Sequence, residues 1–263
     1  MEERELGTLL CTRRNKRIYV RGETLTKLYD HALMPKPKVI KEAWVQSVVE
    51  TTGLNVPKVR LIYPVGEDWA VDFDYIAGES LLDRMTAHPE RTKEYIDQLI
   101  ALQLKVHEAS CVGLPDMKEK FNKKISALGR VSDPAKHVEA TLRYELHVAL
   151  DKMPAHRKLC HGDFLPDNIL FDAQGEPHIF DWAHASLGNG SADAAHTYLQ
   201  LIIEGHQDWA EMYLPAYAAA AGVEVSYIRS WFPMVAATML DKTDDVAVIE
   251  HLKRLIESIE AEQ

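Results

Sequence analysis

The sequence predicts an α+β fold of two lobes, a small antiparallel-sheet N-terminal lobe with one helix and a larger, mainly helical C-terminal lobe. Residues 1–76 hold short runs of β-branched and aromatic residues, separated by turn residues and interrupted by one helical pattern. Residues 77–263 carry helical periodicity throughout, except for a hairpin pattern between residues 158 and 181. We therefore expect lobes 1–76 and 77–263.

The N-terminal lobe is expected to alternate strands and tight turns around a single helix. Pro35 and Pro37 mark the entry of that helix, because proline is favoured in a first helical turn. Apolar residues between Val39 and Thr52 fit one helical face, and Gly53 ends the pattern. Strands are expected over residues 9–11, 18–20, 24–29, 58–63 and 69–75.

The C-terminal lobe is expected to be helical on both sides of a hairpin. Lys158–Cys160 reads as a strand, and Pro166 keeps residues 161–168 in a loop, because proline cannot continue a helix. Strands 169–171 and 178–180 then flank a turn at residues 172–175. Helices are expected over residues 90–108, 117–129, 134–152, 191–204, 207–221 and 226–261, the last in one or two pieces.

The loop and the hairpin carry three oxygen-bearing side chains, Asp163, Asn168 and Asp181. Each alone is typical of a turn or a cap, but the joint spacing suits phosphoryl transfer. That reaction needs a carboxylate to orient the attacking hydroxyl, and an amide oxygen with a second carboxylate to hold magnesium. We therefore expect the three to converge, with Asp163 as the catalytic base and Asn168 and Asp181 as Mg²⁺ ligands.

The stretch from His161-Gly162-Asp163 to Asn168, followed by Phe180-Asp181-Trp182, resembles the aminoglycoside phosphotransferase and choline kinase family. These are small-molecule kinases with a protein-kinase-like fold. The resemblance covers most of the chain and is strongest over residues 158–200. It implies a nucleoside triphosphate donor, ATP or GTP, between the lobes, and a small-molecule hydroxyl acceptor. It also implies that His161 and Asp193 hold the catalytic loop rather than react.

The same resemblance implies the nucleotide-binding residues. Lys27 matches the strand lysine that contacts the phosphates, and Glu42 matches the helix glutamate that orients it. Asn15 matches an asparagine of the turn that covers the phosphates, while Tyr75 and Ile76 fall on the inter-lobe connector beside the base.

The turn at residues 12–17 departs from the family pattern, because Thr12-Arg13-Arg14-Asn15-Lys16-Arg17 contains no glycine. Glycine lets backbone N–H groups approach phosphates closely. Here basic side chains would have to bind phosphate instead, or the turn is simply a solvated hairpin. The missing glycines leave open a second interpretation, a nucleotide-binding scaffold with weak catalysis.

Composition narrows the classes of function. Among 263 residues, 30 Lys and Arg face 40 Asp and Glu, for a formal charge of −10. This disfavours nucleic acid as a partner and suits a cationic substrate, although acidic proteins are also simply soluble. No apolar run is long enough for a membrane helix, the start is too polar for a secretory signal, and three cysteines argue against a disulfide framework. We expect a cytoplasmic protein.

The acceptor is expected to be a small cation, such as an aminoglycoside-like or amino-alcohol molecule. Acidic residues of the helical lobe either face it or form solvated helix faces: Glu204, Asp208, Glu211, Asp241, Asp244 and Asp245. A metal-dependent phosphoesterase is a less favoured alternative, because the histidines near the hairpin lack the spacing of paired metal ligands.

Overall fold

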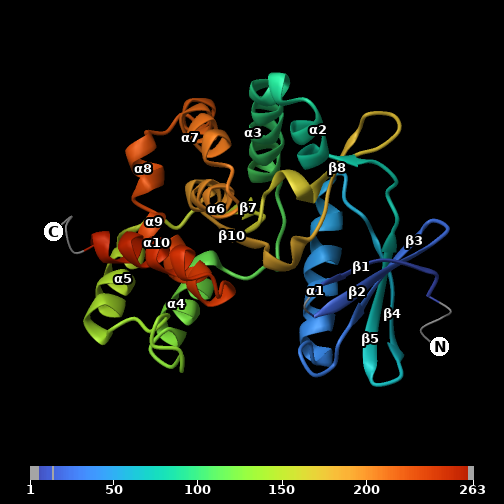
Figure 1. Cartoon of the computed structure of the whole chain (residues 1–263), viewed down its shortest axis with the longest axis horizontal. Helices are drawn as coiled ribbons and strands as arrows, with labels where there is room; N and C mark the ends of the chain where they lie inside the picture. The colour runs from blue at the N-terminus through green and yellow to red at the C-terminus, as the bar shows by residue number, and fades with distance from the viewer. Residues whose placement is uncertain (1–5, 14, 260–263) are drawn as a thin grey trace. The chain divides into compact units, whose positions relative to one another are not determined.

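The structure is a computed structural model that describes residues 6–13 and 15–259 (Figure 1). Its contacts form two compact units. The first runs through Ala87 and adds Cys111–Gly113 and Pro166–His184. The second comprises His88–Ser110, Leu114–Leu165 and the chain from Ala185 onward. Because these units follow contacts rather than the order of the sequence, the lobes 1–76 and 77–263 stay a prediction.

A five-stranded antiparallel sheet, in the order β1-β2-β3-β5-β4, forms the body of the first unit. Each predicted strand is present, and the first two are longer than expected. Only residues 14 and 15 separate β1 from β2, and Arg14 of the predicted phosphate-covering turn lies outside the described residues. The strands are β1 (Thr8–Arg13), β2 (Lys16–Arg21), β3 (Thr24–Tyr29), β4 (Val59–Val65) and β5 (Asp68–Asp74).

The two faces of this sheet bury different apolar clusters, as strand alternation requires. Tyr19, Leu28 and Ala70 pack on one face. On the other face Tyr29, Val71 and Phe73 pack against Val39 and Ala43 of α1. Helix α1 (Lys36–Val49) therefore covers the second face, as Figure 1 shows. It begins one turn earlier than the apolar pattern predicts, because Pro35 and Pro37 tolerate the first turn of a helix.

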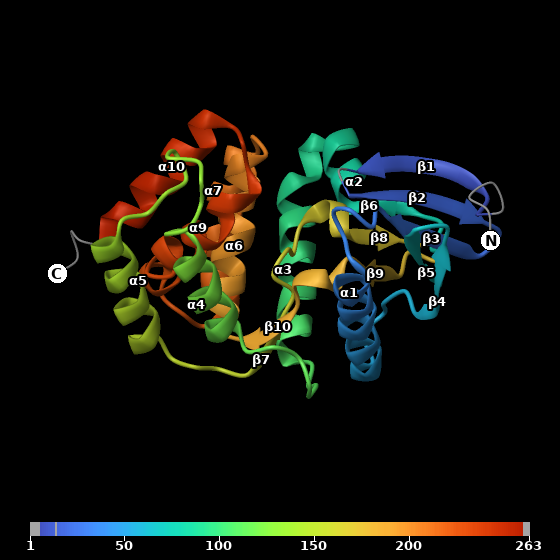
Figure 2. The same ribbon diagram turned by 90° about the horizontal axis from the view of Figure 1, so that it is seen from below.

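The predicted hairpin belongs to the first unit as β8 (Ile169–Phe171) and β9 (Pro177–Ile179). A short strand that the sequence did not predict, β6 (Glu79–Ser80), pairs with β8 and is followed by α2 (Leu81–Ala87) (Figure 2). Gly78 is required where this strand begins, because a Cβ there would overlap the carbonyl oxygen of Phe171.

The second unit is helical. Helix α6 is almost entirely buried and packs against α7 and α9, while α3 packs against α7 and β7 (Figure 2). Its one small sheet pairs β7 (Lys158–Cys160) with β10 (Ser186–Gly188). The helices are α3 (Thr92–Glu108), α4 (Met117–Ala127), α5 (Ala140–Lys152), α6 (Gly190–Ile203), α7 (Gln207–Ala221), α8 (Val225–Arg229), α9 (Phe232–Met239) and α10 (Val246–Glu257).

Two helix predictions are wrong in extent. The helix expected from residue 134 begins at Ala140, because Asp133 closes a turn there: its carbonyl accepts the N–H of Lys136 and its carboxylate that of Ala135. The segment 226–261 contains three helices rather than one or two, since Pro233 starts α9 and Asp245 caps a separate α10.

Across the described parts of the chain, none of the helices combines the length and apolar character that a membrane crossing demands.

Candidate active site

Asn168 and Asp181 lie at the open end of the β8–β9 hairpin, as the spacing predicts. Ile169 pairs with Ile179, and the Phe180 N–H donates to the Asn168 carbonyl at 3.1 Å. The ladder thus sets the residue before β8 beside the segment that follows β9. The Asp181 side chain is 33% exposed, so its carboxylate is open to a ligand from water.

The backbone at Asp181 adopts an unusual conformation. Its φ of 63° makes it the one non-glycine residue with positive φ among those described. Aspartate tolerates the left-handed region of positive φ better than most residues do. Non-glycine residues in this region are nevertheless uncommon, and they are concentrated at functional sites. The neighbouring Trp182 fixes the turn, because its buried indole N–H donates to the Ile179 carbonyl at 2.9 Å. This accounts for the Asp-Trp pair of the sequence motif.

Lys27 reaches toward Asp181 from the central strand of the sheet. It pairs with Ile18 of β2 and Val71 of β5, which places it on the face that α1 covers. The Lys27 Nζ lies 3.1 Å from Asp181 Oδ1 and 3.4 Å from Glu42 Oε1. The pairing of Lys27 with Glu42, expected from the family resemblance, is therefore present.

Electrostatics keep the Lys27 ammonium charged. Burial alone would lower the pKa of Lys27, but the carboxylates of Asp181 and Glu42 outweigh it and raise that pKa above its ordinary value. Glu42 is itself held in place by the buried Tyr29, whose hydroxyl donates to Glu42 Oε1 at 2.6 Å. The cluster thus presents a fixed cation beside a half-exposed carboxylate.

Two members of this cluster, Lys16 and Tyr29, were not singled out from the sequence, although Lys16 belongs to the basic turn at residues 12–17. They pair with each other across β2 and β3, which places both on the face of Lys27. Lys16 Nζ lies 3.6 Å from Asp181 Oδ2. Burial, and then the charge of Lys27, lowers the pKa of Lys16. Only the strand register reveals this placement, and the run Lys16-Arg17 does not say which of the two side chains turns inward.

The remaining nucleotide-binding predictions rest on backbone positions. Tyr75 and Ile76 follow β5 and are half-buried, and the Tyr75 N–H donates to the Glu23 carbonyl at 2.8 Å. Asn15 forms the turn after β1, and its carbonyl accepts the Asp30 N–H at 3.1 Å. Their contacts with a nucleotide stay predictions.

Asp163 lies in the second unit, in the loop that follows β7. Asp193, near the start of α6, holds this loop by its backbone: Asp193 Oδ1 accepts the Gly162 N–H at 2.7 Å, and Oδ2 accepts the His161 N–H at 3.3 Å. The predicted bracing role of Asp193 is confirmed by these contacts. Asp163 as catalytic base, and its convergence with Asn168 and Asp181, stay predictions.

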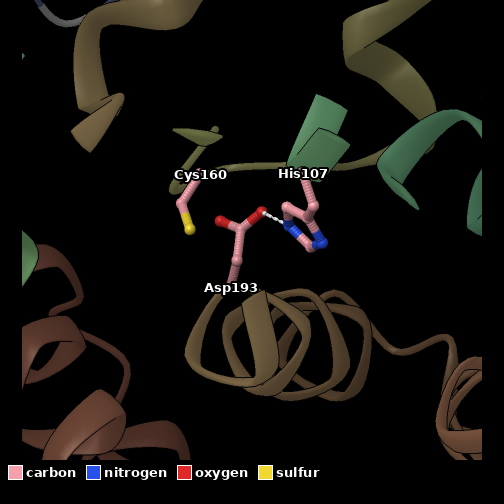
Figure 3. A group of neighbouring side chains, drawn as sticks. All are labelled: His107, Cys160 and Asp193. Atoms are coloured by element: carbon pink, nitrogen blue, oxygen red, sulfur yellow. Dashed lines mark hydrogen bonds and ion pairs between the residues drawn. The ribbon is translucent and has the colours of Figure 1, made fainter. Parts of the chain in front are cut away.

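The Asp193 carboxylate sits in a fully buried cluster with His107 of α3 and Cys160 of β7 (Figure 3). His107 Nε2 lies 2.9 Å from Asp193 Oδ2, and Gln103 Nε2 donates to the same oxygen at 3.2 Å. Burial would raise the pKa of Asp193, but the hydrogen bond and charge of His107 and the Gly162 N–H hold that pKa below its usual range.

This His-Cys-Asp cluster has the composition of a metal site but not its chemistry. Both Asp193 oxygens are already engaged by N–H donors. His107 Nε2 is engaged with Asp193, and Tyr217 Oη lies 3.1 Å from His107 Nδ1. Burial, and then the charge of Asp193, raises the pKa of the Cys160 thiol well above its ordinary value. The cluster is therefore a structural hydrogen-bond network.

The network extends to α7 through two buried tyrosines that sequence reasoning missed. The Tyr213 hydroxyl donates to Gln103 Oε1, and Tyr217 Oη lies 3.1 Å from His107 Nδ1. Gln103 and His107 are four residues apart on α3, as are Tyr213 and Tyr217 on α7, so each pair shares one helical face. This four-residue spacing was the only feature of the sequence that could have indicated the network, and it is equally typical of ordinary core positions.

Several acidic residues proposed for a cationic acceptor have local structural partners. Asp241 pairs with Lys124 at 3.4 Å, and Asp245 caps α10 by accepting the Val248 N–H at 3.0 Å. These contacts favour the solvated-face interpretation for those residues. Glu204, Glu211 and Asp244 likewise bond to Gln200, Tyr198 and Lys136, while Asp208 lies in the first turn of α7.

Comparisons with known proteins agree with this geometry. Residues 13–227 match the model of the phosphotransferase enzyme family. The chain superposes on aminoglycoside phosphotransferase APH(4)-Ia with a TM-score of 0.70 and 17% identity, covering 95% of this chain and 93% of the other. Choline kinase LicA from Streptococcus pneumoniae gives 0.64 and 16%, covering 96% and 92%. No curated protein sequence matches the chain closely enough to count as a relative.

A choline/ethanolamine kinase family protein from Mesorhizobium loti is also similar, with a TM-score of 0.61 and 15% identity over 96% of this chain and 88% of the other. One APH(4)-Ia structure is a ternary complex with AMP-PNP and hygromycin B. The kinase-like α+β fold and the family predicted from the motif are confirmed.

Proposed function

The chain belongs to the phosphotransferase enzyme family, and we propose that it transfers the γ-phosphate of ATP or GTP to a hydroxyl of a small, cationic molecule. The observation that carries the proposal is the Lys27–Glu42–Asp181 cluster, at the end of the hairpin whose first strand follows Asn168. A fixed ammonium next to a partly exposed carboxylate is the arrangement that phosphoryl transfer uses for a metal-bound triphosphate.

The donor set fits magnesium, which prefers carboxylate and amide oxygens and takes few ligands from the protein. Asn168 and Asp181 would hold Mg²⁺, which neutralises charge on the phosphates when bound. Lys27, oriented by Glu42, holds the phosphate chain in place. Asp163 accepts the proton of the attacking hydroxyl, and Asp193 keeps its loop fixed through Gly162.

Support for a cationic acceptor comes from the net charge of −10 and from the structurally similar proteins, which include an aminoglycoside phosphotransferase and a choline kinase. An acidic protein concentrates cations near its surface. Aminoglycosides and amino-alcohols share a hydroxyl on a positively charged molecule. We propose this shared chemistry as the substrate class.

The test couples ADP or GDP release to a panel of alcohols that includes choline, ethanolamine and hygromycin B, with mass spectrometry to detect the phosphorylated product. We expect nucleotide turnover that depends on both Mg²⁺ and one acceptor. Calorimetric titration with Mg-ATP and Mg-GTP serves as the acceptor-independent arm. A chain that binds neither nucleotide would contradict the proposal.

A further inference from the structure

Two lysines, rather than one, converge on Asp181. Lys27 Nζ lies 3.1 Å from Asp181 Oδ1, and Lys16 Nζ lies 3.6 Å from Asp181 Oδ2. Both lysine side chains are largely buried, with 12% and 15% of their surface exposed. They share one face of the sheet, since Ile18 pairs with Lys27 and Lys16 pairs with Tyr29.

A purely structural role does not explain the second lysine. Lys16 Nζ and Lys27 Nζ both approach the one Asp181 carboxylate, although their like charges repel each other. Lys27 by itself already contacts both carboxylates of the cluster, Asp181 and Glu42, so Lys16 is not needed to hold either of them in place. Two ammonium groups that share one carboxylate are both positioned to bind a polyanion that approaches that carboxylate.

The position of Lys16 in the chain indicates which polyanion. It is the first residue of β2, directly after the turn that lacks glycine. A glycine-rich turn would offer backbone N–H groups to phosphate, whereas this chain places a flexible ammonium at the end of the same turn. The positive charges of Lys16 and Lys27 balance the negative charges of Asp181 and Glu42, so the cluster is neutral by itself.

We propose that Lys16 is a second triphosphate-binding lysine, which replaces the backbone donors of a glycine-rich turn. The proposal rests on the proposed function and names a residue for its donor site. Both lysines are paired with Asp181 in this structure. With Mg²⁺ held by Asp181, the phosphate oxygens would become their partners. The two ammonium groups then balance charge that Lys27 alone would leave uncompensated.

The experiment measures nucleotide affinity rather than turnover. Wild type, Lys16→Met, Lys16→Arg and Lys27→Met are titrated calorimetrically with the triphosphate, the diphosphate and the nucleoside of the preferred base, in the presence of Mg²⁺. Lys16→Met is expected to weaken triphosphate binding about tenfold to a hundredfold, the range of one charge-assisted hydrogen bond. Nucleoside binding should be unchanged, and Lys16→Arg should retain most of the triphosphate affinity.

Arg17→Met is the matched control. Arg17 is the next residue of β2, points to the opposite face of the sheet and pairs with Asp68 at 3.0 Å. The Arg17→Met variant removes the same charge from the same strand, so its triphosphate affinity should equal that of wild type. Far-UV circular dichroism and thermal unfolding confirm that each variant is folded.

The outcomes separate this inference from the proposed function. Wild-type triphosphate affinity in Lys16→Met, with loss of binding in Lys27→Met, overturns the role of Lys16 alone. Equal weakening of nucleoside and triphosphate binding in Lys16→Met also overturns it, because the change would then act on the fold of the site. A wild-type chain that binds no triphosphate overturns both.

Discussion

The two units of this protein each hold a central aspartate, and the two carboxylates are treated in opposite ways. Asp181 of the first unit is 33% exposed, and its partners are the ammonium groups of Lys16 and Lys27. Asp193 of the second unit is fully buried, and its partners are two backbone N–H groups and the buried side chains of His107 and Gln103. Flexible partners can be exchanged for a ligand, whereas backbone donors cannot.

This difference teaches how to separate a reacting carboxylate from a supporting one when both lie near a sequence motif. An aspartate whose oxygens are saturated by buried donors has no capacity left for a metal or a substrate. Its contribution is to fix the loop that carries Asp163. An accessible aspartate held by side-chain cations is available for chemistry. Substitution of Asp181 should therefore affect mainly activity, and substitution of Asp193 mainly stability.

Asp181→Asn is expected to have the largest effect, the loss of Mg²⁺-dependent nucleotide turnover. The substitution removes the anionic metal ligand but preserves its shape. Because Asp181 is partly exposed and Glu42 remains beside Lys27, the free energy of unfolding should fall less than in Asp193→Asn. Nucleotide turnover against Mg²⁺ concentration, with urea unfolding in parallel, is the measurement. Unaltered magnesium dependence would contradict the role of Asp181.

Asp163→Asn should lower kcat by about two to four orders of magnitude, the usual contribution of a positioned base. The variant keeps a hydrogen-bonding side chain, so nucleotide affinity is expected to stay near that of wild type. Steady-state kinetics with the acceptor found in the alcohol panel gives kcat and KM separately. A kcat close to that of wild type would remove Asp163 from the mechanism.

Asp193→Asn should instead act mainly on stability. Removing one partner of a buried, hydrogen-bonded charge typically lowers the free energy of unfolding by about 3–5 kcal/mol. The remaining amide cannot accept from His107, Gly162 and His161 as the carboxylate does. Urea denaturation measures the loss, and Asp181→Asn is its control. Equal stability of the two variants would contradict the proposed difference between the buried Asp193 and the partly exposed Asp181.

The sequence predicted the hairpin, the sheet and the family correctly because these depend on local patterns. Asn168 and Asp181 flank two short apolar runs separated by a turn, and the strand pairing sets both residues at the open end of the hairpin. The pair of Lys27 and Glu42 followed from the family resemblance, since the flanks of Lys27 did not decide its face. Packing of α1 on that face decides it.

Lys16 and His107 escaped prediction because their roles depend on non-local geometry. Lys16 lies on the face of the sheet that α1 covers because of the β2–β3 register, and the residues around Lys16 do not specify that register. The pairing of His107 with Asp193 joins residues 86 positions apart, through the packing of helices in the second unit. A histidine on an apolar helical face gives no indication of such a partner.

His107→Gln is expected to have a smaller effect than Asp193→Asn, a loss of about 1–3 kcal/mol in the free energy of unfolding, the cost of leaving a buried acceptor poorly satisfied. Glutamine retains a donor but not the ring whose Nε2 lies 2.9 Å from Asp193 Oδ2. Replacing His178, whose Nε2 lies 2.8 Å from Asp172 in the partly exposed hairpin turn, gives the control. His178→Gln should cost less, because that pair is screened by water.

The contact between Asp193 and His107 also predicts how the stability of the protein depends on acid pH. The pKa of Asp193 is lower in the folded protein than in the unfolded chain, so its stabilising effect is complete above the unfolded-state value of about 4 and is lost as pH falls below it. The stability gap between wild type and Asp193→Asn should therefore narrow as urea unfolding is repeated from pH 6 toward pH 3. In the His107→Gln background the gap should be smaller at pH 6 and change less. A gap that is constant over this range would mean that Asp193 is not held in its charged form by the fold.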